Sequence, residues 1–214
     1  MRLWISLAAA VALGALAGWV DASSRPPRAG ELDELLYYPS GTFVRQAALG
    51  YETAAADLAW LRSVQYYGEH RLTDQRFDRI DHVMRIVGEL DPRFEEPYVF
   101  GSFVLAQEMK QPDRGLKLIR AGLEKNPESW RLAFETGFLH YVCRHDYVAA
   151  AHYFMLAARA PGHPEYVDRF AAFASQKAGQ DELAVLLWRR VLATGNKYMQ
   201  DVARREIERL GGTL

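Results

Sequence analysis

The chain has 214 residues, of which 50% are hydrophobic and 25% are charged, and its formal net charge is -1. This composition is that of a globular protein with a sizeable core. A net charge near zero gives no electrostatic attraction to nucleic acid, so we predict no nucleic-acid partner. The single cysteine, Cys143, excludes an internal disulfide and a paired-cysteine metal or redox motif.

The N-terminus begins with a long apolar segment. Residues 3–20 carry no charge, and as a helix they would extend about 27 Å, close to the thickness of the hydrocarbon core of a bilayer. We therefore predict that residues 1–20 are a membrane anchor that is not cleaved. The alternative is a signal segment that is cleaved near the small residues Ala15 and Ala17 or, with a looser match, near Val20 and Ala22. Either reading places the rest of the chain outside the cytoplasm.

Two glycines in this segment, Gly14 and Gly18, match the spacing of a helix-dimer motif. The alanine and glycine content of the segment explains the match without a homodimer. Residues 21–36 are rich in serine, proline and arginine, and we predict that they form a flexible linker. Residues 37–51 are expected to form a lead-in, with a turn around Pro39 followed by a short helix.

From residue 52 to residue 214 the pattern predicts only helices. Apolar residues recur at helical spacing, and no alternating run with a two-residue turn indicates a hairpin. The first helix is expected to bury one face. That face comprises Thr53, Asp57, Trp60, Val64 and Tyr67.

A repeat is visible in the spacing of the prolines. Asp91-Pro92 and Asn126-Pro127 each place a capping residue before a proline, which predicts the start of a helix. With Pro161, these prolines recur at intervals of about 34 residues, the length of a repeat of two helices. Small residues recur at a similar interval, and they are Gly68, Gly101, Gly137 and Ala171.

The repeat resembles the tetratricopeptide repeat. The match is best between Trp130 and Pro161, where Gly137 falls on the small position of the first helix. Ala149 falls on the small position of the second helix, and Tyr153 falls on the aromatic position that follows it. The fourth repeat matches with one extra residue, at Ala171, Ala184 and Trp188.

This resemblance implies an all-α fold over residues 52–214: a right-handed α-solenoid of about four helix pairs with a C-terminal capping helix, preceded by the N-terminal transmembrane or signal helix. Residues 197–210 are the predicted capping helix. The second repeat departs from the family pattern, because Gly115 and Gly122 stand where alanines are usual. Its register is therefore left open.

Three stretches before and within the first repeat carry a second resemblance. They are YYPSG, LGY and DLAWLRSVQYYG, and they look like the lead-in of membrane-anchored repeat proteins of bacterial envelopes. That resemblance implies a single-pass protein of the inner membrane with its repeat domain in the periplasm. A soluble periplasmic protein is the alternative if the N-terminal segment is cleaved.

Tetratricopeptide arrays bind a peptide or partner on the concave side, which the first helix of each pair lines. Aromatic residues and arginine are the types enriched at binding hot spots, and the third repeat carries both. The alternative is that Phe134 and Phe138 belong to the core. The groove residues that the register implies are Arg62, Gln65, Glu69, Tyr98, Ser102, Arg131, Phe134, Phe138 and Tyr141.

Asp57 shares the expected buried face with Trp60 and Val64, where a carboxylate needs a partner. We predict a buried polar tie between the lead-in and the first repeat, with Arg62, Arg45 or tyrosine hydroxyls from the lead-in as its partner. A ligand-binding or catalytic role for Asp57 is the alternative.

No catalytic or cofactor motif is present in the sequence. His140 and Cys143 are one helical turn apart, and His145 is close, but no fourth metal ligand is near in sequence. We therefore predict no metal, no cofactor and no enzymatic activity.

The predicted function is that of a scaffold or tether that binds another envelope or membrane protein. An accessory subunit of a larger membrane complex is the first alternative, such as a secretion, pilus or respiratory assembly. A cell-wall hydrolase is the second, and it would need a cleft with facing carboxylates or a His–carboxylate pair.

Overall fold

The computed structural model describes residues 40–213, and every regular element in this part is helical. The described residues belong to one compact unit, Tyr38–Leu214. The all-α prediction is confirmed for this part, in which no strand occurs. The predicted anchor at 1–20, the linker at 21–36 and the glycine pair Gly14 and Gly18 lie outside the described residues. Within 40–213, no helix is both long enough and apolar enough to cross a membrane.

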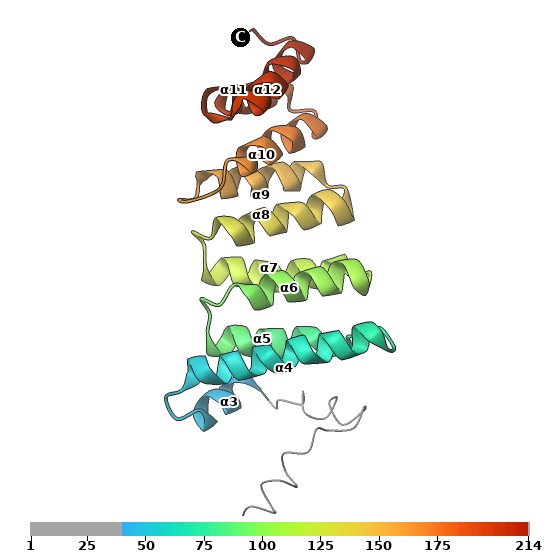
Figure 1. Ribbon diagram of the computed structural model, residues 1–214, viewed down its shortest axis with the longest axis vertical. Helices are drawn as coiled ribbons and strands as arrows, with labels where there is room; N and C mark the ends of the chain where they lie inside the picture. Colours follow the sequence, from blue (N-terminus) through green and yellow to red (C-terminus); the bar gives the residue numbers. More distant parts are fainter. Residues whose placement is uncertain (1–39, 214) are drawn as a thin grey trace, which may run out of the picture. The chain divides into compact units, whose positions relative to one another are not determined.

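The helices follow one another along the chain with short connections (Figure 1). Their bounds are α3 Gly41–Ala47, α4 Glu52–Leu72, α5 Ile80–Leu90, α6 Glu96–Phe103, α7 Pro112–Lys125, α8 Trp130–Leu139, α9 Tyr147–Arg159, α10 Tyr166–Lys177, α11 Asp181–Thr194 and α12 Lys197–Arg209. Two π-helical turns extend α6 and α8, and they are η1 Val104–Glu108 and η2 His140–Arg144.

Each helix from α4 to α12 packs mainly against its neighbours in the sequence, so the helices lie in successive layers in chain order (Figure 1). Four pairs result: α4 with α5, α6 with α7, α8 with α9, and α10 with α11, followed by α12. We call the first helix of each pair an A helix and the second a B helix. In such an arrangement each pair contacts only the neighbouring pairs, so it buries its apolar face against them.

Side-chain caps begin several of these helices. Ser129 Oγ accepts a hydrogen bond from the amide of Leu132, and Asp146 and Asn196 cap α9 and α12 in the same way. The prediction that Asp91-Pro92 and Asn126-Pro127 begin helices is wrong. Asp91 and Asn126 are the C-caps of α5 and α7, because proline prevents a B helix from continuing, and the next A helix begins only after a turn.

The turn after each A helix contains a residue with left-handed backbone. These residues are Gln75, Lys110, His145 and Gly179, with φ of 57°, 57°, 51° and 72°. After η1 and η2, a backbone hydrogen bond reaches back across the turn. It joins Gln111 N to Leu105 O at 2.9 Å in the first case and Asp146 N to His140 O at 3.1 Å in the second. A non-glycine residue in this conformation costs about 1 kcal/mol, so the equivalent turns carry strain at three of four sites.

The core repeats one position on every B helix. The side chains at this position are all fully buried, and they are Met84, Ile119, Phe154 and Trp188. One turn earlier, each B helix has another buried residue, and these residues are Ile80, Gly115, Ala150 and Ala184. In the last three pairs this residue is small (Gly115, Ala150 and Ala184), which leaves room for the facing A helix.

The register predicted for the third pair is therefore wrong by one residue. Ala150 and Phe154 are buried, whereas the predicted Ala149 and Tyr153 are partly exposed. With Ala150 and Phe154 in these positions, the fourth pair needs no extra residue.

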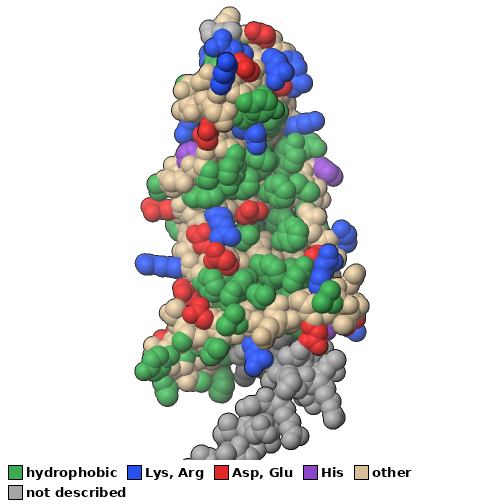
Figure 2. Space-filling model, viewed as in Figure 1, with side chains coloured by type: hydrophobic (Ala, Val, Ile, Leu, Met, Phe, Trp, Pro, Cys, Tyr) green, Lys and Arg blue, Asp and Glu red, His purple; other side chains and the backbone are tan. Residues whose placement is uncertain are grey.

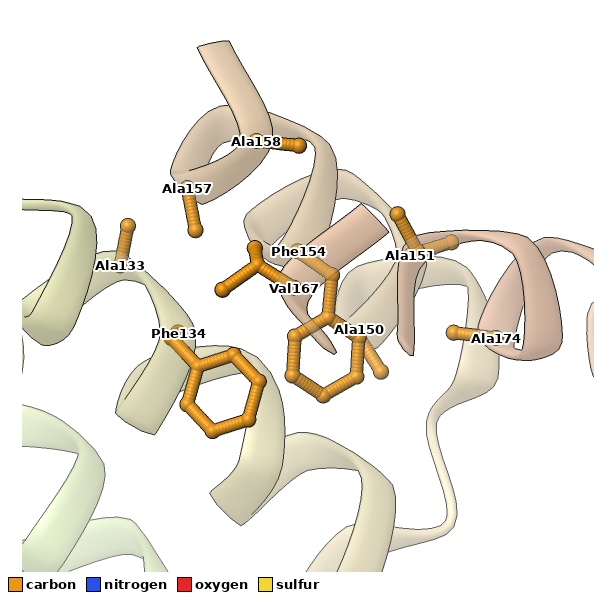
Figure 3. Close-up of a cluster of buried hydrophobic side chains, with 10 residues drawn as sticks. Ala133, Phe134, Ala150, Ala151, Phe154, Ala157, Ala158, Val167 and Ala174 are labelled. Atoms are coloured by element: carbon orange, nitrogen blue, oxygen red, sulfur yellow. The ribbon is translucent and has the colours of Figure 1, made fainter. Parts of the chain in front are cut away.

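Close helix contacts explain several of the glycines within helices. A Cβ added to Gly137 would lie 2.9 Å from the Phe154 ring, and one added to Gly115 would lie 2.6 Å from Ser102 O. In the same cluster the rings of Phe134 and Phe154 lie 5.1 Å apart among small side chains (Figure 3). Gly68 differs, since nothing lies within 4 Å of the Cβ position, so it does not set the repeat register.

Candidate functional site

The A helices present a continuous surface of partly exposed side chains, which we call the A-helix face. On α8 and its extension η2 the outward residues are Arg131, Glu135, Phe138 and Val142, at the spacing of one helical stripe. The same stripe recurs on the other A helices. The A-helix face comprises Leu61, Val64, Glu96, Val99, Phe100, Phe103, Arg131, Glu135, Phe138, Val142, Tyr166, Phe170 and Phe173.

Aromatic contacts between Trp60 or the buried Phe134 and residues of this face join one pair to the next. Trp60 on α4 meets Phe100 on α6, with ring centroids 5.6 Å apart. Further along, Phe134 on α8 meets Tyr166 and Phe170 on α10 at 5.4 and 5.1 Å. Hydrophobic side chains form a band across successive helices in the drawn view, and charged side chains interrupt the band near its middle (Figure 2).

An acidic and basic cluster lies within the apolar face. Arg131 Nη1 donates to Glu96 Oε1 at 2.6 Å and thereby ties α8 to α6. Burial raises the pKa of Glu96, but the hydrogen bond from Arg131 and other local interactions outweigh it, and the net pKa is below the ordinary value. Burial also raises the pKa of Glu135, and there the positive charge of Arg131 offsets only part of the effect.

Several residues predicted to line the groove are not available to a ligand. Tyr98, Ser102 and Phe134 are buried, so their assignment to the binding surface is wrong. Tyr98 donates a hydrogen bond to Gly88 O at 3.0 Å, and burial raises its pKa to about 12. The alternative reading of Phe134 as core is the correct one, because its ring packs on α9 and α10. Arg131, Phe138 and Tyr141 remain partly exposed.

The predicted residues on α4 have a different role from the one expected. The positions equivalent to Arg62 in later pairs are buried, and they hold Pro97, Leu132 and Val167. Those equivalent to Glu69 are also buried, and they hold Val104, Leu139 and Ala174. Among the described residues, the first pair has no preceding B helix to cover these positions, so polar residues occupy them. Gln65 is exposed beside them and accepts a hydrogen bond from Arg62 at 3.4 Å.

The predicted buried tie at Asp57 is wrong, because Asp57 is exposed. The buried face of α4 is made of small residues and one tyrosine: Ala56, Ala59, Ser63 and Tyr66. Arg45 instead donates a hydrogen bond to Glu89 O on α5, which ties the lead-in helix to the first pair.

Sequence reasoning missed Phe103, Glu135 and Phe173. Phe103 is 47% exposed on α6, although large apolar residues usually avoid such exposure. The signal was present, because Phe103, Phe138 and Phe173 recur at equal intervals along the chain.

A hollow of about 480 Å³ lies beside α7 and η2. His140 is buried there, its ring stacks on Tyr153, and its Nε2 accepts from Arg120 Nη2 at 2.8 Å. Burial, and then the charge of Arg120, lower the pKa of His140. Charged residues of the lining balance in sign, and they are Lys117, Arg120, Arg144, Asp113, Glu124 and Asp146. This hollow therefore has no preference for an anion or a cation.

The residues weighed as metal ligands are used otherwise. Cys143 Sγ accepts a hydrogen bond from Gln107 Nε2 at 3.0 Å, which joins η2 to η1, and His145 is exposed. Across residues 40–213, no three His, Cys, Asp or Glu side chains are placed to hold a metal ion.

The described part of the chain thus defines an all-α protein of stacked helix pairs with one apolar, aromatic face. No protein-family model matches the chain, and no curated protein is similar to it in sequence.

Proposed function

We propose that this protein is a tetratricopeptide-like α-solenoid that works as a scaffold or tether and binds a partner protein on its A-helix face. One observation carries the proposal: partly exposed aromatic residues occupy the same outward position on α6, α8 and α10, namely Phe103, Phe138 and Phe173. Monomeric proteins rarely expose contiguous apolar surface of this kind without a binding role.

The energetics of the face suit recognition. Aromatic side chains bury a large area on binding and lose little conformational entropy, because they have only two rotatable bonds. Their backbone is held by helix packing before a partner arrives, so little ordering is needed on association. Arg131, near the centre of the surface, is of a residue type that is enriched at binding hot spots.

The proposed location follows from the apolar segment at residues 3–20, which carries no charge. As an anchor it would hold the helix pairs at the outer surface of the inner membrane, in the periplasm. The partner would then be another envelope or membrane protein. Proteolysis of spheroplasts tests this location, because a cytoplasmic helix domain would be protected from added protease.

A specific observation favours the alternative function, an accessory subunit of a larger membrane complex. At the start of the array, Phe43, Leu49 and Tyr51 are highly exposed on α3 and in its connection to α4. Exposed apolar side chains at this end, together with the A-helix face, would let the protein bridge two neighbours. Blue-native electrophoresis of mildly solubilised membranes separates the two functions, because a subunit migrates with a large complex and a tether does not.

Site-specific photocrosslinking tests the binding surface in cells. We place p-benzoylphenylalanine at Phe103, on the A-helix face, and at Val148 on α9 as a control, since Val148 is 58% exposed outside that face. The proposal expects a discrete crosslinked product from position 103 and none from position 148. Equal crosslinking at both positions, or none at 103, would overturn it.

A further inference from the structure

Glu135 occupies an unusual place on the A-helix face. At the equivalent position, α6 carries Phe100 and α10 carries Phe170, so a carboxylate stands where both neighbouring A helices have an aromatic ring. Its side chain is only partly exposed. The middle of the apolar face is therefore acidic at one point.

The structure gives this carboxylate no direct partner. Within residues 40–213, no hydrogen bond or ion pair is formed by Glu135, although Arg131 lies one turn earlier on the same helix. Arg131 directs its guanidinium to Glu96 instead, at 2.6 Å. The three charged residues together carry a net charge of about -1 when all are ionised.

A partly buried and unpaired carboxylate is unfavourable in the free protein. Burial raises the pKa of Glu135, which reflects this cost. A cation brought by a ligand would remove the cost and would also lie close to aromatic rings, whose faces attract cations. An acidic ligand would be repelled, and an apolar one would bury the charge further.

We propose that Glu135 pairs with the side chain of a lysine or arginine from the bound partner segment. Apolar residues on either side of this basic residue contact Phe103, Phe138 and the neighbouring aromatic positions of the A-helix face. This inference rests on the proposed function, and it specifies the chemistry of the partner.

The first experiment selects peptides with the full chain, purified in mild detergent, from a phage library of random 12-residue sequences. Parallel selections use Glu135→Gln, Glu135→Lys and a control variant, Glu182→Gln, which changes an exposed glutamate on the B helix α11. We expect wild type and control to select a lysine or arginine flanked by apolar residues. Glu135→Gln should lose the basic preference, and Glu135→Lys should select acidic residues there.

The outcomes separate the two proposals. Enrichment of apolar peptides without a basic residue, or the same basic consensus from Glu135→Lys, overturns the inference and leaves the binding face intact. No enrichment by wild type overturns the proposed function itself.

A second measurement uses a selected peptide and its lysine-to-glutamine counterpart in a double-mutant cycle, read by fluorescence anisotropy. Replacing the peptide lysine should weaken binding to wild type about tenfold and leave binding to Glu135→Gln nearly unchanged. An equal loss with both proteins would show that the lysine binds elsewhere, which overturns the assignment to Glu135. Circular dichroism of Glu135→Gln verifies that the variant is folded.

Discussion

The buried position of Phe154 gives the sharpest test of the packing. Its side chain is fully buried, and its ring lies 5.1 Å from Phe134 and 5.5 Å from Phe170. Fully burying a phenylalanine side chain contributes up to about 3 kcal/mol. Phe154→Ala loses most of this contribution and also leaves a cavity, so we expect a total loss of about 4 kcal/mol in the free energy of unfolding.

Tyr153 is the matched control, because the sequence register had assigned it the same role. It is partly exposed and stacks on His140, with ring centroids 5.4 Å apart. Tyr153→Ala should therefore cost only about 1–2 kcal/mol. Urea unfolding of the full chain in mild detergent, followed by circular dichroism at 222 nm, measures both changes. A larger cost for Tyr153→Ala than for Phe154→Ala would refute the register in which Phe154 fills the core.

The loss at Phe154 is a large part of the total stability of a typical domain, about 5–15 kcal/mol. If Phe154→Ala does not fold, Phe154→Leu serves instead, with an expected cost of about 1–2 kcal/mol.

Three further predictions concern charges and backbone. Glu135→Gln should raise the free energy of unfolding at pH 7 by up to about 1 kcal/mol after solvent screening. The pKa of Glu135 is raised in the folded protein, so its contribution to stability is present below pH about 4.3 and is lost as the carboxylate ionises. Chemical unfolding at pH 4 and at pH 7 measures the difference, and an equal effect of the substitution at both pH values would contradict the prediction. The depressed pKa of His140 means that the folded state resists protonation, so stability should fall as the pH drops below about 6.5; His140→Gln should flatten that dependence of the melting temperature, and an unchanged slope would assign it to other groups. His145→Gly should raise the free energy of unfolding by about 1 kcal/mol, because His145 has φ 51°; urea unfolding measures it, and a loss of stability would show that the imidazole makes a contact worth more than the backbone strain.

The order of the helices was predictable because their signals are local. Capping residues such as Ser129 and Asn196 and the prolines after α5 and α7 act over a few residues. The spacing of about 34 residues follows from two such helices and their turns. These signals mark the boundaries between helices without any knowledge of what the helices pack against, although Pro92 and Pro127 were assigned to helix starts and in fact follow helix ends.

The buried faces were harder to predict, because close packing favours small residues. On α4 the sequence suggested a face with Trp60 and Val64, whereas the buried stripe contains Ala56, Ala59 and Ser63. Alanine and serine give little hydrophobic contrast, and Leu58 remains 64% exposed on the same helix. Periodicity of large apolar residues therefore pointed to the wrong side.

The register of the third pair failed for a related reason. Three consecutive alanines, 149–151, and the adjacent aromatic residues Tyr153 and Phe154 offer two frames that are equivalent in sequence. The choice depends on which alanine faces Gly137 on α8, a contact between helices that local propensity does not encode. The same limit applies to Phe134 and Phe138, which are one turn apart and differ only in how deeply α10 covers them.

The two ends of the array explain why the candidate site lies near its centre. At the start, Arg62 and Glu69 replace apolar residues, and at the other end α12 buries Ala203 and Ile207 while its remaining surface is charged. End helices open more readily than those packed on both sides. A partly buried charge in an end pair would be relieved by local opening, whereas α8 has neighbours on both sides. Glu135 therefore stays partly buried in the free protein, and under our proposal its carboxylate remains unpaired until a partner supplies a cation.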